Sequence, residues 1–200
     1  MRLLFTDEAA FGRISDPKNC WCQSGTRPDI HTQQVREYFD AYGAVEPETG
    51  DKHFHVEMPS EKQPRKRGRR KKGEPPPQDP PKEKGAKSRA FNNFLRQLSD
   101  KYPTDFLVIA CDNAWWHKSQ YTVIPENIRL IYIPPYTPEM NPIEQIWREI
   151  RTMGFHNKYF KTLLKVKENF YETIANLSPD KIKSITQRDW LPSSVKSIAA

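Results

Sequence analysis

Short apolar runs, separated by polar and turn residues, organise the first third of the chain. Residues 2–6 (RLLFT) form an apolar run that ends at Asp7, which predicts a buried strand with a carboxylate at its end. Residues 35–45 mix aromatic and β-branched side chains, residues 47–50 are typical of a hairpin turn, and residues 53–58 alternate like a returning strand. This pattern predicts an antiparallel meander.

The second half of the chain alternates between helical and strand-like patterns. Apolar side chains recur at helical spacing in three segments, and two strongly apolar runs are too short for helices. We expect helices over residues 90–98, 141–153 and about 163–177, with Trp147 on the apolar, core-facing side of the second. We expect strands over residues 106–111 and 128–133, and the segment between these strands leaves room for only a brief helix. The fold class expected is therefore α/β: a mixed sheet, with an antiparallel meander at one side and parallel strands at the other, flanked by helices.

Length and composition favour one soluble domain. Two hundred residues suffice for a sizeable core, and no apolar run approaches the roughly 18 residues of a membrane helix. The N-terminus turns acidic after a few residues, unlike a signal peptide. Three cysteines are an odd number, which argues against a secreted disulfide framework. We expect a cytoplasmic protein with reduced thiols and no membrane partner.

The net charge of +7 is concentrated in one segment. Residues 59–89 hold twelve Lys or Arg and four Asp or Glu, a net of +8, so the other 169 residues carry about −1. The segment is also proline-rich and almost without apolar residues, which predicts a disordered insertion in a single domain formed by residues 1–58 and 90–200. Its basic run can bind DNA phosphates without reading sequence, or it is merely solvated. The candidate DNA-contacting residues are Arg65, Lys66, Arg67, Arg69, Arg70, Lys71 and Lys72.

Three carboxylates stand at positions that suit catalysis. Asp7 and Asp112 follow apolar strands, and Glu144 lies near the start of the helix after the second central strand. Strand ends are where active sites gather in α/β sheets. Three carboxylates in one pocket need a cation to stay ionised, and hard divalent ions prefer such oxygen ligands. A pair of ions about 3.5–4 Å apart can cleave a phosphodiester.

Each acid also has a plain structural explanation. Asp112 with Asn113 is typical of an Asx turn that ends a strand. Glu144 fits a helix-capping box whose N-cap would be Asn141. Asp7 fits an ordinary surface acid. The spacing by itself leaves the catalytic and the structural interpretations open.

Two further groups carry weaker signals. Trp115 and Trp116 can stack on a flipped base, although packing is the more common role of such residues. Cys20, Cys22 and His31 lack a fourth ligand and the usual zinc spacing, which argues against a zinc site.

Several strings resemble the catalytic domain of bacterial insertion-sequence transposases of the mariner-like superfamily, which are DDE endonucleases with a ribonuclease-H-like fold. The similarity runs in order along nearly the whole chain except about residues 59–89, and PPYTPEMNPIEQIW is its most specific part. The strings are TDEAAFGR, VREYFDAYGAVEPETG, ACDNAWWHKS, PENIRLIYIPPYTPEMNPIEQIW and FHNKYF.

The resemblance implies roles for particular residues. Asp7, Asp112 and Glu144 align with the family's three metal-binding acids, which would hold two Mg²⁺ (or Mn²⁺) ions. The family cleaves DNA at transposon ends and joins the freed 3′ hydroxyl to target DNA, typically at a TA dinucleotide. Asn113 and His117 match accessory positions. His117 would orient a carboxylate, contact a phosphate or serve only in the structure, and Asn113 would lie near the metals or shape the turn.

The resemblance also implies partners. These are transposon-end and target DNA, a second copy in a homodimer, and a helix-turn-helix part that recognises the ends. Because Met1 lies about six residues before Asp7, we expect either that a separate or frame-shifted upstream reading frame supplies that part, or that the chain is a truncated remnant. The protein would act in the bacterial cytoplasm, at the nucleoid. Two alternatives stay open: an inactive remnant that binds nucleic acid non-specifically, and a nuclease of the same fold that does not transpose.

Overall fold

The computed structural model describes residues 1–59 and 85–188. The disorder predicted for residues 59–89 is wrong for residues 86–89, which form the first turn of a helix. The rest of that prediction, over residues 60–84, and all seven candidate DNA-contacting residues, Arg65 to Lys72, lie outside the described residues.

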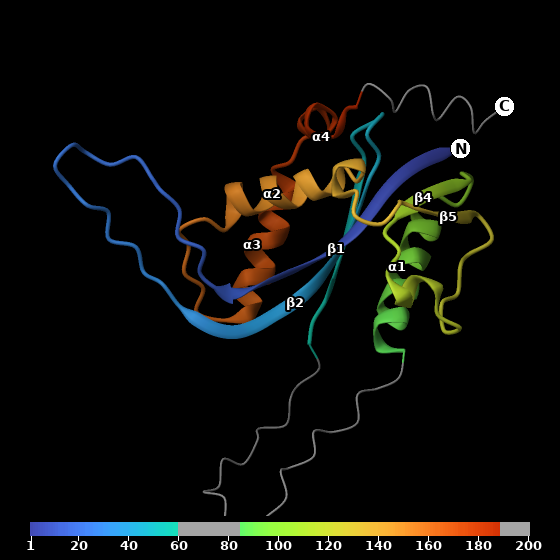
Figure 1. Cartoon of the computed structure of the whole chain (residues 1–200), viewed down its shortest axis with the longest axis horizontal. Coiled ribbons are helices and arrows are strands. Elements are labelled where there is room, and N and C mark those ends of the chain that lie inside the picture. The colour runs from blue at the N-terminus through green and yellow to red at the C-terminus, as the bar shows by residue number, and fades with distance from the viewer. Residues whose placement is uncertain (60–84, 189–200) are drawn as a thin grey trace, which may run out of the picture.

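A five-stranded mixed sheet forms the centre of the molecule, in the order β3-β2-β1-β4-β5 (Figure 1). The strands β1, β2 and β3 pair antiparallel, whereas β1–β4 and β4–β5 pair parallel. The expected fold class is confirmed, with the meander at one side and the parallel strands at the other. The strands are β1 (Arg2–Ile14), β2 (Gln34–Val45), β3 (Lys52–Glu57), β4 (Leu107–Cys111) and β5 (Ile128–Tyr132).

The first strand is longer than its apolar run indicates. The sequence predicts an end at Asp7, but β1 continues to Ile14 because β2 keeps pairing with it as far as Gln34. Asp7 therefore lies inside a strand, opposite Gly43. The hairpin is prolonged by residues 15–33, which project from the body of the molecule (Figure 1).

Four α-helices flank the sheet. The first begins at Ala86, four residues earlier than expected, after Gly85 in the left-handed conformation. The last was not predicted; it is short, and the Ser178 side chain caps it by accepting a hydrogen bond from the Lys181 backbone N–H. No helix among the described residues is long and apolar enough to cross a membrane. The helices are α1 (Ala86–Lys101), α2 (Ile143–Gly154), α3 (Leu163–Ala175) and α4 (Pro179–Thr186), with 3₁₀ turns η1 (Trp115–Lys118) and η2 (Pro138–Met140).

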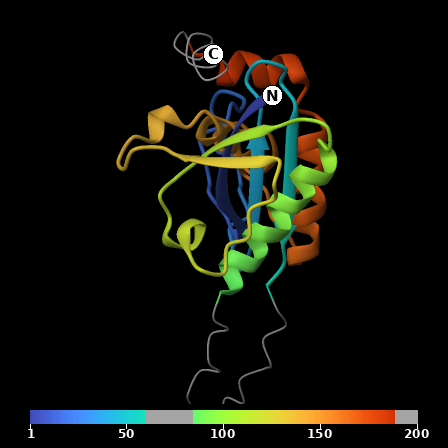
Figure 2. The same ribbon diagram turned by 90° about the vertical axis from the view of Figure 1, so that its right-hand side faces the viewer.

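Each face of the sheet buries its own hydrophobic core. The helix α1 covers one face, and α2, α3 and α4 cover the other (Figures 1 and 2). The core between the sheet and α2, α3 and α4 is rich in aromatic rings. The ring centroid of Phe11 lies 4.8 Å from that of Phe170 and 5.9 Å from that of Trp147. Trp147, with 1% of its surface exposed, is in the core as expected. The aromatic packing fixes α2 against β1 and β2.

Gly43 is the point where α2 comes closest to the sheet. A Cβ atom there would lie 2.7 Å from Cη2 of Trp147 and 2.8 Å from Cε1 of Phe54. Both rings belong to the packed core, so neither can move without disturbing its neighbours.

We expect Gly43→Ala to lower the free energy of unfolding by about 1–3 kcal/mol, because the new methyl group overpacks the core. Urea denaturation followed by tryptophan fluorescence measures the change. Ala10→Ser, at an exposed position of β1, is the matched control and should unfold like the wild type. Equal stability of both variants would contradict the close packing of Trp147 on β2.

Candidate active site

The parallel pairing of β1 with β4 brings Asp7 and Asp112 together. Its register pairs Arg2 with Leu107 and ends with Phe5 opposite Ala110. Two residues further along each chain, the same register places Asp7 opposite Asp112. Alternate residues of a strand share a face, so Asp7 follows Phe5 toward the face that α2 covers. Asp112 is the first residue after β4 and lines the same pocket as Asp7. The edge where the parallel pairing ends is therefore acidic.

Glu144 reaches this edge from the first turn of α2. It is exposed, and its negative charge acts on Asp7. The capping-box interpretation of Glu144 is wrong in this structure, because Asn141 does not cap the helix: Pro142 is the N-cap residue and makes no side-chain cap bond. Instead, Nδ2 of Asn141 donates a hydrogen bond to the Thr6 carbonyl at 3.1 Å, which ties the start of α2 to β1 beside Asp7.

The three acids line one pocket. Its volume is about 340 Å³, and the segment after β5 and the start of α2 form its other walls. Asn141 lines it too, and the Oδ1 atom of this residue is buried with no hydrogen-bond partner in the described part of the chain. The full set of lining residues is Asp7, Asp112, Asn113, Ala114, Ile133, Pro134, Pro135, Tyr136, Thr137, Asn141 and Glu144.

Asp7 is the most strongly perturbed carboxyl group of the pocket. Burial raises its pKa from 3.8 to about 7, and the nearby charges of Glu144 and Glu8 act in the same direction. Hydrogen bonds from the Glu8 backbone and from the Trp147 side chain oppose the rise; the indole Nε1 donates to Oδ2 of Asp7 at 3.0 Å. Because the rise prevails, the carboxyl group needs a nearby cation to be fully ionised at neutral pH.

Asp112 is exposed, and one of its oxygens is engaged by the protein. The Oδ1 atom accepts a hydrogen bond from the Ala114 backbone N–H at 3.1 Å and lies 3.0 Å from Nδ1 of His117. The turn that follows β4 is thus an Asx turn as well as part of the pocket. Both contacts use the same oxygen, which leaves Oδ2 to face a ligand.

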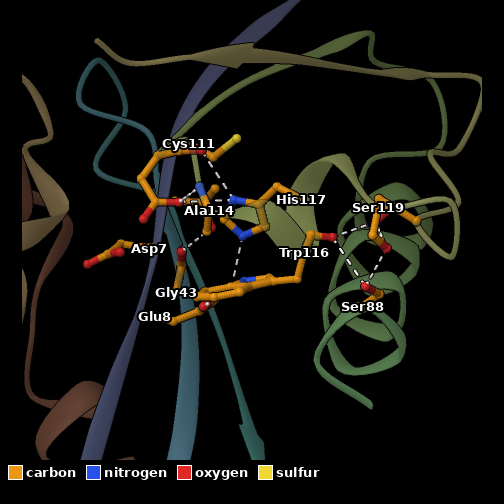
Figure 3. A network of polar contacts seen from close by, with 12 residues as sticks. Asp7, Glu8, Gly43, Ser88, Cys111, Ala114, Trp116, His117 and Ser119 are labelled. Carbon is orange, nitrogen blue, oxygen red and sulfur yellow. Dashed lines mark hydrogen bonds and ion pairs between the residues drawn. The ribbon is translucent and has the colours of Figure 1, made fainter. Parts of the chain in front are cut away.

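His117 links Asp112 to a fourth acid, Glu8. Its ring is 3% exposed, and Nε2 lies 3.0 Å from Oε1 of Glu8 (Figure 3). Burial lowers the pKa of His117, but contacts with Cys111 and Glu8 outweigh it and raise the pKa to about 10. His117 is therefore an imidazolium between two carboxylates. Trp116 holds the far side of Glu8, since its Nε1 lies within 3.2 Å of both carboxylate oxygens.

The other residues singled out in the sequence lie around this centre. Asn113 joins the ends of β4 and β5: its Nδ2 donates to the Ile133 carbonyl at 2.9 Å, and its Oδ1 accepts from Lys118. Trp115 is exposed near the pocket, whereas Trp116 packs under Lys87. Sequence reasoning missed the roles of Glu8 and Trp147 toward the acids; the alternation of side chains along β1 is the signal that separates Glu8 from Asp7.

The donor set suits a hard divalent cation. Carboxylate oxygens and an unpaired buried amide oxygen are ligands that Mg²⁺ and Mn²⁺ accept, and a cation would relieve the repulsion between Asp7 and Glu144. In their present rotamers, no three His, Cys, Asp or Glu side chains of residues 1–59 and 85–188 converge closely enough to hold one ion.

Comparisons with known proteins agree with this fold. Residues 80–167, a little under half of the chain, match the family model of the DDE superfamily endonuclease. A stretch of 85 residues is 34% identical to Uncharacterized protein y4pE/y4sA of Sinorhizobium fredii, covering 42% of this chain and 63% of that protein. The family match confirms the resemblance to DDE endonucleases that the sequence motifs indicated.

Solved structures show the same fold over nearly the whole chain. A Mos1 transposase paired-end complex with the left transposon end matches 98% of this chain and 53% of that chain, at 14% identity and a TM-score of 0.63. The catalytic domain of Mos1 mariner transposase matches 92% of this chain and 75% of that chain, at 12% identity and a TM-score of 0.57. The chain thus has the ribonuclease-H-like fold of these catalytic domains and spans about half of the longer Mos1 chain.

The raised pKa of Asp7 predicts a pH-dependent cost in stability. The folded state holds the Asp7 proton more tightly than the unfolded state, so ionisation destabilises the fold as the pH rises from about 4 to about 7. Asp7→Asn keeps an acceptor for Trp147 and removes this cost. In EDTA, the variant should gain about 1–3 kcal/mol over the wild type between about pH 4 and pH 8.

Thermal denaturation across this pH range measures the difference. Asp16→Asn, which changes an exposed aspartate of the loop after β1, is the control and should follow the wild type at every pH. A constant difference between Asp7→Asn and the wild type at all pH values would show that Asp7 is ionised with its ordinary pKa.

Proposed function

We propose that this chain is the catalytic domain of a DDE-type transposase, which cleaves DNA at transposon ends and joins the freed 3′ hydroxyl to target DNA. The observation that carries the proposal is the convergence of Asp7, Asp112 and Glu144 on one pocket at the end of the parallel pairing. The family match over residues 80–167 and the fold shared with Mos1 transposase support it.

The three acids would hold divalent cations, Mg²⁺ or Mn²⁺, and we propose two of them. Such an ion pair activates the attacking oxygen and stabilises the leaving oxygen of a phosphodiester. Mos1 paired-end complexes have been described with Mg and with Mn, which supports the same metals here. The raised pKa of Asp7 supports the need for positive charge in this pocket.

The remaining residues of the site position the acids. Trp147 fixes the carboxylate of Asp7 through Oδ2. His117 fixes Asp112 through Oδ1 and carries a positive charge, which limits the net negative charge that DNA phosphates meet. Asn141 ties α2, and with it Glu144, to β1. These contacts hold the pocket in place before metal and DNA arrive, which is the arrangement that favours catalysis by positioning.

DNA is the proposed partner, in two roles, as transposon end and as target. The Mos1 structures contain paired ends and strand-transfer assemblies, and we extend this to a homodimer of the present chain. End recognition would belong to a separate DNA-binding part of the helix-turn-helix kind.

The first test is metal-dependent nicking of supercoiled plasmid DNA. We expect the wild type, joined to an end-binding domain, to nick DNA with Mg²⁺ or Mn²⁺ and to lose activity in EDTA. Asp112→Asn and Glu144→Gln should reduce the rate by about 100-fold or more, because each removes a charged ligand. Glu149→Gln, on the same helix but ion-paired with Lys181, is the matched control and should keep wild-type activity.

The outcomes separate the alternatives. Nicking without joining of a 3′ hydroxyl to target DNA would identify a nuclease that does not transpose. Folded protein that binds DNA but never nicks it would identify an inactive remnant. Nicking that survives both substitutions would remove the acids from the active site.

Metal binding can be read without activity. We expect Mg²⁺ in the millimolar range to raise the melting temperature of the wild type by about 2–4 °C at pH 8, the shift produced by about 1 kcal/mol of binding energy. Asp7→Asn and Glu144→Gln should lose most of this shift, and Glu149→Gln should retain it. A shift of equal size in all four proteins would point to ions bound elsewhere.

A further inference from the structure

A second cavity lies at the other end of α2. It has a volume of about 140 Å³ and is enclosed by β1, by the residue before β2 and by the segment that follows α2. Its walls include the rings of Phe11, Phe155 and Phe160 and the side chains of Gln33 and Arg151. None of these residues takes part in the site described above.

Gln33 is the unusual member of this cavity. It is 9% exposed, and among the described residues neither Nε2 nor Oε1 has a hydrogen-bond partner. Its backbone is held on both sides by Ser15, whose Oγ accepts from the Gln33 N–H at 3.1 Å and whose N–H donates to the Gln33 carbonyl at 3.0 Å. A fixed, buried amide with an unused donor and an unused acceptor costs stability unless a ligand pairs with both.

The other walls define what kind of ligand fits. The ring of Phe155 lies 4.9 Å from Phe11 and 5.7 Å from Phe160, so one side of the cavity is aromatic. The guanidinium of Arg151 lies 4.9 Å from the Phe11 ring, and its one hydrogen bond, to the Ala10 carbonyl, is 3.5 Å long. Its donors are therefore available to an anion at the rim.

Two other charged side chains at the cavity, Lys158 and Asp16, each have a partner, and His156 also lines it. Lys158 donates to Oδ1 of Asn169 at 3.0 Å, and Asp16 lies 3.1 Å from Nζ of Lys18. Arg151 is thus the cation best placed to meet a phosphate.

We infer that this cavity is a nucleobase subsite, which takes one base turned out of the bound DNA, pairs its edge with the Gln33 amide and holds the adjoining phosphate with Arg151. A glutamine amide pairs with base edges through one donor and one acceptor, and aromatic side chains receive the face of an unstacked base. A flat ring is the ligand class that uses both the amide and the aromatic wall; a phosphate alone can accept from Nε2 but leaves Oε1 and the aromatic wall unused.

The subsite rests on the proposed function, because the catalytic pocket sets where DNA lies. Arg151 lies seven positions after Glu144 in α2, a distance of about 10 Å along the helix. Stacked DNA advances about 3.4 Å per nucleotide of a strand, so a base about three nucleotides from the scissile phosphate reaches the cavity. Both sites would then read the same strand along one helix.

Binding of mononucleotides to the whole metal-free chain tests the subsite, with the four deoxynucleoside 5′-monophosphates as probes and deoxyribose 5-phosphate as the base-free control. We expect saturable NMR shifts of the Gln33 side-chain amide and of the backbone amides around the cavity with at least one nucleotide, and none with the sugar phosphate; the backbone amides report binding in the Gln33 variant. Gln33→Leu should weaken that binding by about tenfold or more. Gln34→Leu, which alters the exposed neighbouring residue, should not weaken it.

Gln33→Leu keeps the size of the side chain and removes the unpaired amide, so the variant should fold and melt about 2–4 °C higher than the wild type. Unchanged nucleotide binding by this folded variant would overturn the subsite. Equal shifts with the sugar phosphate would overturn it in favour of an anion site. A change in oligomeric state on Gln33→Leu without nucleotide shifts would assign the cavity to a protein contact and likewise overturn it.

The readout is independent of cleavage. Asp112→Asn should retain nucleotide binding at Gln33, since Asp112 lies in the other pocket. A chain that binds nucleotides but never nicks DNA would refute the catalytic proposal alone, and a chain that nicks DNA without nucleotide binding would refute the subsite alone.

Discussion

The parallel pairing of β1 with β4 is the constraint on which the candidate active site depends. It ends at Phe5 and Ala110, and the shared register then places Asp7 beside Asp112. Because β1 continues beyond this point in its pairing with β2, Asp7 sits on a rigid strand and not on a loop. Two contacts dock α2 onto the same stretch: Asn141 to the Thr6 carbonyl, and Trp147 to Asp7. The helix that supplies Glu144 is thereby placed by the strand that supplies Asp7.

The distribution of charge explains why this arrangement calls for a cation. Asp112 and Glu8 share the positive charge of His117. Asp7 receives two hydrogen bonds, and a typical hydrogen bond to a charged group contributes about 1.5–3 kcal/mol. Burial and the charges of Glu144 and Glu8 outweigh these two hydrogen bonds, so the pKa of Asp7 rises to about 7. His117 thus compensates negative charge of Asp112 and Glu8 within the protein. The charge of Asp7 is left to an external partner, and a divalent ion can serve as that partner.

Much of the fold could be predicted because its signals are local: apolar runs and turn residues marked the strands. Asp7 and Asp112 follow such runs directly, whereas the grouping of these two acids with Glu144 came from the family resemblance and not from spacing. The length of β1 could not be predicted, since the polar pair of Asp7 and Glu8 interrupts the apolar pattern while the pairing with β2 continues. The helix α4 was missed because eight residues carry little periodicity. Glu8 and Asn141 escaped because their contacts, with His117 and with Thr6, join segments more than 100 residues apart.

The cavities at the two ends of α2 share a physical feature that separates them from the cores. Each contains a buried polar side chain with an unpaired atom, Oδ1 of Asn141 at one end and the amide of Gln33 at the other. A leucine at position 33 would avoid the desolvation cost, so folding alone does not account for Gln33, whereas Asn141 also ties the start of α2 to β1 through its Nδ2 atom. Polar groups held in place without partners are preorganised for partners that arrive later. With an oxygen ligand near the acids and an amide beside an aromatic wall, the two cavities would form the two ends of a DNA-binding track along α2.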